Sequence, residues 1–226
     1  MDFGGNRAPK SRLGRGGQAE GTPPKDQINI PSRLMNGTDA LIALAQAFED
    51  AGLPYMIVGS YSSNFYGIPR STKDADLVIN LDQADWKKLS SILPAGLELD
   101  QQSGFEMVTS TRKELIRVKD SVFEIELFHL SKDAHDSVRF ERRHRVPIIP
   151  GVEAWLPTAE DVIIQKLRWS RGAKRPKDFA DVVAVMQVQG PARLDWSYIE
   201  EWCEKHDTLD LLAEAKAEAA YAWEDV

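Results

Sequence analysis

Short apolar runs alternate with amphipathic stretches along most of the chain. The segments with strand-like patterns are 55–58, 77–81, 105–110, 115–118 and 122–130. Apolar residues recur at helical spacing over 38–52, with Thr38 or Asp39 as the expected N-cap, and again over 82–93. Because strands and helices are mixed within one stretch of about a hundred residues, the pattern predicts a small α/β sheet domain.

The pattern changes after residue 150, where only helical periodicity remains. The predicted helices cover 158–170, a segment that begins at Pro176, 195–205 and 208–221. Residues 1–37 instead carry many glycines, prolines and basic residues without an apolar period, which is typical of a disordered tail. We therefore predict a tail over 1–37, a mixed-sheet core with flanking helices over 38–150, and a C-terminal helical lobe over 151–226.

Candidate chemistry lies between the first two strands. The first strand stops at Gly59-Ser60, where the backbone must turn sharply or approach a ligand closely. Asp74 and Asp76 stand at the entrance of the second strand, two residues apart, so both carboxylates point to one face. They would repel each other unless a cation lay between them, and hard oxygen ligands favour Mg²⁺ or Mn²⁺. The alternative is a plain turn followed by a solvated acidic strand end.

A Gly-Ser turn followed by Asp-x-Asp resembles the signature of the polymerase-beta superfamily of nucleotidyltransferases. The resemblance implies that backbone N–H groups at Gly59 and Ser60 bind a triphosphate, with the Ser60 hydroxyl as a further donor. It also implies that Asp74 and Asp76 hold one or two metal ions that bridge the phosphates and activate the acceptor.

A third carboxylate on a neighbouring strand is expected for such a site. The strand 122–130 offers Glu124 and Glu126, which share one face, so the alternation of the strand does not choose between them. Relatives show Val-Asp-Leu-Phe-x-Leu here, and this resemblance aligns the acid with Glu126. The third residue would complete the metal site or accept the proton of the acceptor.

Basic residues accompany the acidic motif. Arg70 and Lys73 directly precede the aspartates, where they could bind the phosphates of a nucleotide or merely balance the acidic pair. A second basic run is either a solvated face or a contact for a nucleotide or RNA, and its members are Arg139, Arg142, Arg143 and Arg145.

The C-terminal segment narrows the resemblance. Glu160-Asp-Val-Ile-Ile-Gln-Lys166-Leu, followed by Arg175-Pro-Lys-Asp178-Phe-Ala-Asp181, is similar to the lysine helix and the Asp-x-x-Asp helix of AbiEii-type nucleotidyltransferases, which include toxins of bacterial toxin–antitoxin pairs. The resemblance implies a helical lobe that closes over the nucleotide. Lys166 would contact the triphosphate or base, and Asp178 would orient Lys166 or the acceptor.

Composition limits the cellular setting. A net charge of −7 argues against bulk, non-specific binding to nucleic acid. Cys203 is the only cysteine, so no intramolecular disulfide can form and a reducing cytoplasm is expected. No apolar run approaches the length that spans a membrane.

The sequence thus predicts an NTP-dependent, metal-dependent nucleotidyltransferase with Asp74, Asp76, Glu126, Lys166 and Asp178 as catalytic residues. The acceptor would be an RNA end or a protein, and a cognate antitoxin is a further expected partner. The alternatives are a non-catalytic nucleotide- or partner-binding protein on the same fold, and a small-molecule enzyme of the antibiotic-modifying kind.

Overall fold

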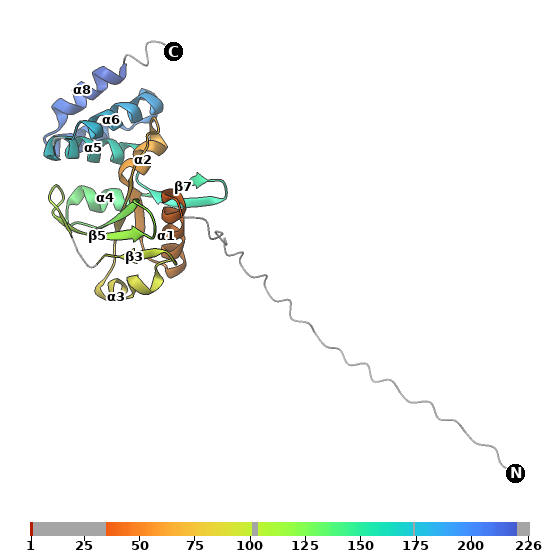
Figure 1. The fold of residues 1–226 in the computed structure, drawn as a ribbon. Coiled ribbons are helices and arrows are strands. Elements are labelled where there is room, and N and C mark those ends of the chain that lie inside the picture. The colour runs from red at the N-terminus through yellow and green to blue at the C-terminus, as the bar shows by residue number, and fades with distance from the viewer. Residues whose placement is uncertain (2–34, 101–103, 174, 221–226) are drawn as a thin grey trace. The chain divides into compact units, whose positions relative to one another are not determined.

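The computed structural model describes residue 1 and residues 35–100, 104–173 and 175–220 (Figure 1). The helices are α1 (Gly37–Ala51), α2 (Gly59–Tyr66), α3 (Gln83–Ile92), α4 (Ala134–Arg142), α5 (Ala159–Ala173), α6 (Pro176–Gln189), α7 (Trp196–Lys205) and α8 (Leu209–Ala220). The strands are β1 (Tyr55–Val58), β2 (Asp74–Ile79), β3 (Leu97–Leu99), β4 (Gly104–Glu106), β5 (Thr111–Val118), β6 (Glu124–His129), β7 (His144–Ile149) and β8 (Val152–Leu156). A short 3₁₀ turn, Pro191–Arg193, precedes α7.

The central sheet mixes parallel and antiparallel strands. Its order is β1-β2-β6-β5-β3, and β4 also pairs with β5. β2 and β6 run parallel, whereas β1 pairs with β2 and β5 pairs with β6 in antiparallel fashion. The predicted α/β class with a small mixed sheet is therefore confirmed.

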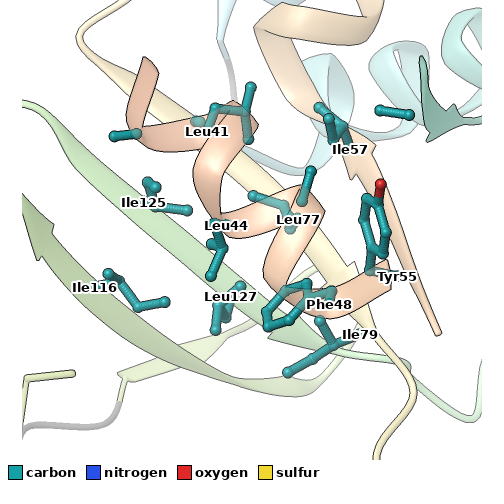
Figure 2. Close-up of a cluster of buried hydrophobic side chains, with 14 of the residues drawn as sticks. Leu41, Leu44, Phe48, Tyr55, Ile57, Leu77, Ile79, Ile116, Ile125 and Leu127 are labelled. Carbon is teal, nitrogen blue, oxygen red and sulfur yellow. The ribbon is translucent and has the colours of Figure 1, made fainter. Parts of the chain in front are cut away.

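One face of this sheet is covered by α1. Figure 2 shows Leu41, Leu44 and Phe48 of the helix packed against apolar side chains of the strands. The N-cap is Asn36, whose side-chain oxygen accepts from the backbone N–H of Asp39 at 2.9 Å, so the predicted caps Thr38 and Asp39 lie inside the helix. The predicted end is confirmed, since Gly52 adopts the left-handed conformation with φ of 66°.

The strand period of two gives β2 two different faces. Ala75, Leu77 and Ile79 point into the apolar core that α1 covers. Asp74 and Asp76 therefore lie on the opposite face, together with Val78, which packs in a separate small apolar cluster. The backbone of one strand thus supplies both the core and the acidic surface.

A second apolar core lies among α5, α6, α7 and α8. Figure 1 shows α5, α6 and α8 side by side, and α2 contacts both α5 and α6. Tyr66 at the end of α2 is buried within this second core, and its hydroxyl donates to the Pro157 carbonyl at 2.8 Å. Gly67 follows it, and a Cβ there would come within 2.9 Å of the Val185 backbone nitrogen, so α2 and α6 touch at backbone level.

Several elements differ from the sequence expectation. The strand that was expected over 105–110 is only the short β4, which is followed by a turn, and β5 is longer than expected because it begins at Thr111. Helix α4 and the β7–β8 hairpin were not predicted; in α4, charged residues hide the apolar period. Nearly all of the predicted tail lies outside the described residues, and the division at residue 150 stays a prediction.

No helix in the described part of the chain is long and apolar enough to cross a membrane.

Candidate active site

A cavity of about 350 Å³ opens on the acidic face of the sheet. Its wall combines the end of β1, the start of α2, strands β2, β5 and β6, the turn after β4, and side chains from α4, α5 and α6. The predicted site residues that line it are Gly59, Ser60, Asp74, Asp76, Glu126, Lys166 and Asp178. Residues that are far apart in the sequence are therefore brought to one cavity.

The parallel pairing of β2 with β6 positions the carboxylates. Asp76 is in register with Glu126, and Asp74 is in register with Glu124. Only Glu126 of the two glutamates lines the cavity, whereas Glu124 forms an ion pair with Arg117 at 3.4 Å. Of the two glutamates that strand alternation left open, Glu126 is the one that shares the cavity with Asp74 and Asp76; its role stays a prediction.

Asp76 is the most electrostatically perturbed of these acids. Burial raises its pKa to about 7, and the negative charges of Glu126 and Asp74 add to the effect. The positive charges of Lys166 and Arg175 act in the opposite direction but do not compensate. Asp74 Oδ1 accepts a hydrogen bond from the Thr72 hydroxyl at 2.7 Å.

The Gly59-Ser60 turn lies directly against Asp76. Gly59 has φ of 62°, and a Cβ built on it would lie 1.9 Å from Asp76 Oδ2, so only glycine fits both the backbone and the space. α2 begins at this glycine, which leaves its first backbone N–H groups without partners within the helix. The Ser60 hydroxyl oxygen accepts from Arg70 Nη2 at 3.0 Å, so its hydrogen can point to a ligand.

Lys166 is held by two carboxylates. Its Nζ lies 2.8 Å from Asp178 Oδ1 and 2.7 Å from Asp181 Oδ2, and the residue is only 8% exposed. Asp181 was not predicted as a site residue, yet it also accepts from the Ser63 hydroxyl at 3.2 Å. Burial alone would raise the pKa of Asp181, but hydrogen bonds from Arg70 and Lys166 hold it below its usual range. The geometry pairs Lys166 with Asp178, as the resemblance implies.

Arg70 and Lys73 do not line the cavity. Arg70 donates to both carboxylate oxygens of Asp181, from Nε at 2.7 Å and from Nη2 at 2.8 Å, in the bidentate geometry typical of an arginine–carboxylate pair. The sequence left open whether Arg70 binds phosphate or balances nearby acids. This geometry matches the second interpretation, although the acid that Arg70 pairs with is Asp181. A nucleotide contact for Arg70 and Lys73 stays a prediction.

Three basic side chains of the cavity, Lys113, Arg175 and Lys177, were not among the predicted site residues. Arg139, which the sequence offered as a possible nucleotide contact, also lines the cavity and is paired with Asp136 at 2.8 Å. Two other arginines of the basic run 139–145 also have partners within the protein, Arg142 with Asp161 and Arg145 with Glu153. Lys113 could have been found only from the register of β5 on β6, which a single sequence does not reveal.

Asp74, Asp76 and Glu126 share one face of the sheet and supply the oxygen ligands that a hard divalent cation prefers. In the described ranges, however, no three Asp, Glu, His or Cys side chains are close enough together to hold a metal ion. Glu126 points to Lys113, whose Nζ lies 2.6 Å from its Oε1.

The chain matches no protein-family model and no curated protein. It is similar in structure to the antibiotic-resistance factor ANT(2")-Ia, a nucleotidyltransferase. The crystal structure of that protein in complex with adenylyl-2"-tobramycin is 12% identical, with a TM-score of 0.52, over 74% of this chain and 94% of that chain. Its solution structure is 12% identical, with a TM-score of 0.50, over 81% and 98%. JHP933 from Helicobacter pylori is 14% identical, with a TM-score of 0.48, over 85% and 94%.

At these identities the comparison concerns the fold. The mixed sheet, its flanking helices and the C-terminal helices are those of a nucleotidyltransferase fold.

Proposed function

We propose that this protein is a metal-dependent nucleotidyltransferase that transfers a nucleoside monophosphate from an NTP to an acceptor. The observation that carries the proposal is the meeting of Asp74, Asp76 and Glu126 with the Gly59-Ser60 turn in one cavity. Three carboxylates in one cavity with the N-terminus of a helix that has no side-chain cap are suited to a metal-bound triphosphate.

The chain's own groups have distinct tasks in this proposal. The N–H groups at the start of α2 and the Ser60 hydroxyl donate to phosphate oxygens, and Arg70 fixes the orientation of that hydroxyl. Arg175 and Lys177, which line the cavity, add positive charge where the triphosphate would lie. Lys166, held by Asp178 and Asp181, contributes its charge from a fixed position.

Asp74, Asp76 and Glu126 would hold Mg²⁺ or Mn²⁺. The bound ion would supply charge neutralisation between the phosphates and the acceptor oxygen. Glu126 is also placed to accept the acceptor's proton, since it lines the cavity with an exposed fraction of 27% in its side chain.

The acceptor that we favour is an RNA end or a protein, as in an AbiEii-type, toxin-like enzyme with a cognate antitoxin. This assignment is supported by the arrangement of Lys166 with the Asp178-x-x-Asp181 turn, the motif on which the resemblance rests. A second candidate, adenylylation of a small antibiotic, is supported by the fold shared with ANT(2")-Ia, which was captured with adenylyl-2"-tobramycin.

Incubation with each α-³²P-labelled NTP, Mg²⁺ and total cell RNA and protein tests the proposal. We expect label in one macromolecular fraction, and we expect Asp74→Asn and Glu126→Gln to abolish it while Glu124→Gln, outside the cavity, retains it. Label on an added aminoglycoside alone would favour the antibiotic-type enzyme. Nucleotide binding without transfer to any acceptor would favour a non-catalytic protein.

A further inference from the structure

A lysine ammonium lies inside the acidic site. Lys113 of β5 donates from Nζ to Glu126 Oε1 at 2.6 Å, and the two side chains are 33% and 27% exposed. Lys113 lines the same cavity as Asp74 and Asp76. Its Nζ also lies 5.8 Å from the centre of the Phe128 ring, so one lysine bridges an acid and an aromatic face.

The position of Lys113 follows from the pleat of the sheet. Leu115 pairs with Glu126 and Lys113 pairs with Phe128, so Lys113 is the diagonal neighbour of Glu126 on the cavity face. Arg117 lies on the same face of β5, four residues further along the strand, and is directly opposite Glu124, outside the cavity. The strand therefore carries two cations on one face, and only one of them reaches the proposed metal site.

Two other cations that line the cavity are paired with carboxylates of α6. Lys166 is paired with Asp178 and Asp181, and Arg175 Nε lies 3.3 Å from Asp178 Oδ2. Within the part of the chain that the structure describes, Lys113 makes the only ion pair with a member of the carboxylate trio Asp74, Asp76 and Glu126.

A single ammonium is a poor substitute for a divalent ion at this place. Lys113 contacts one carboxylate of the trio, whereas an ion of charge two at its centre would be attracted by all three. The two cations cannot both be close to Glu126 without repelling each other. Binding of a metal ion at Glu126 therefore competes with the ion pair between Glu126 and Lys113.

We propose that Lys113 is the counter-ion of the carboxylates at the proposed metal site, and that a divalent cation must displace it from Glu126 in order to bind. Lys113 is thus a positioning residue that weakens metal affinity and keeps Glu126 ordered until the metal arrives. This inference rests on the proposed metal site, but it does not depend on which acceptor is used.

The test is a calorimetric titration of Mn²⁺ into the full chain without nucleotide. Lys113→Met should tighten Mn²⁺ binding roughly tenfold, since a repelling charge a few ångströms from the ion is removed. Lys113→Arg, which keeps the charge, should bind Mn²⁺ about as weakly as the wild type. Arg117→Met is the matched control, because it removes a cation from the same strand face outside the cavity, and it should change the affinity less than about twofold.

A second measurement follows the lysine itself. In protein labelled with ¹³C at the lysine Cε, the Lys113 signal, identified by its loss in Lys113→Arg, should shift when Mg²⁺ is added, and this shift should vanish in Glu126→Gln. Mn²⁺ binding to the wild type with equal or weaker binding to Lys113→Met, or a Lys113 signal that ignores Mg²⁺, would overturn the inference and leave the enzyme proposal intact. Failure of Mn²⁺ to bind either protein would overturn both.

Discussion

Neutralising Asp76 should make the metal-free protein more stable. The charged form of this side chain is opposed by burial and by its neighbours Glu126 and Asp74, which raise its pKa to about 7. Asp76→Asn keeps the size of the side chain and removes the charge. We therefore expect a gain in the free energy of unfolding in the presence of EDTA, even though the variant should lose metal binding.

The size of the gain in the free energy of unfolding follows from the pKa shift of Asp76. A pKa raised from 3.8 to about 7 is a change of about three units, which corresponds to ~4 kcal/mol at 1.36 kcal/mol per unit. The side chain of Asp76 is only partly buried, so water in the cavity screens its charge. The expected gain in the free energy of unfolding is therefore reduced to about 1–3 kcal/mol. For a folded unit of this size, the melting temperature should rise by roughly 3–10 °C.

The effect has a defined direction with pH. Since the folded protein holds the Asp76 proton more tightly than the unfolded chain does, its stabilising contribution is complete below about pH 4 and is lost as the pH rises through about 7. The advantage of Asp76→Asn should therefore be absent near pH 4 and full at pH 8. Chemical unfolding at both pH values, with EDTA, measures it.

Glu124→Gln is the control, because Glu124 is on the same sheet face, outside the cavity, in an ion pair with Arg117. It should not gain stability. Excess Mg²⁺ should reverse the order by stabilising the wild type and leaving Asp76→Asn unchanged. A loss of stability in Asp76→Asn at pH 8 without metal would refute the reasoning, because Asp76 would then be favourably paired.

Three further predictions concern other parts of the structure. Lys166→Met should lower the free energy of unfolding by about 3 kcal/mol in urea titrations, because two buried carboxylates lose their shared partner; an unchanged midpoint would show that they are solvated. Gly59→Ala should displace Asp76 and lower the free energy of unfolding by at least about 1 kcal/mol, and it should also weaken Mn²⁺ binding. If the variant kept both its stability and its Mn²⁺ affinity, the turn would have room for a Cβ. Burial, helped by the nearby charge of Arg168, lowers the pKa of His206 to about 4, so wild-type stability should fall by about 1–2 kcal/mol between pH 6.5 and pH 4. His206→Phe should flatten that fall, and an identical pH profile in this variant would exclude His206 as the source.

The local acidic motif could be predicted from the sequence because its placement depends only on short-range geometry. A strand period of two fixes Asp74 and Asp76 on one face, and a glycine at the end of a buried strand marks a turn whatever the rest of the chain does. The third acid, Glu126, required the family resemblance, since only the cavity wall distinguishes it from Glu124.

The charged partners could not be predicted, because they depend on long-range pairing. Asp181 lies 111 residues from Arg70 along the chain, and nothing near either residue indicates that they meet. The family resemblance implies that Lys166 contacts the triphosphate or base, yet its buried position also suits a lysine held between two acids. An apolar environment shows that a charge needs a partner, but it does not identify the partner.

The close contact between α2 and α6 means that α2 packs with the C-terminal helices, although it lies among the sheet strands in the sequence. Tyr66 and Gly67 lie between strands β1 and β2 in the sequence, yet they pack against the C-terminal helices. The Gly59-Ser60 turn at the other end of α2 is thereby tethered to those helices as well as to the strands. A rotation of the C-terminal helices against the sheet would move this turn directly, so α2 would transmit such a motion to the proposed phosphate site.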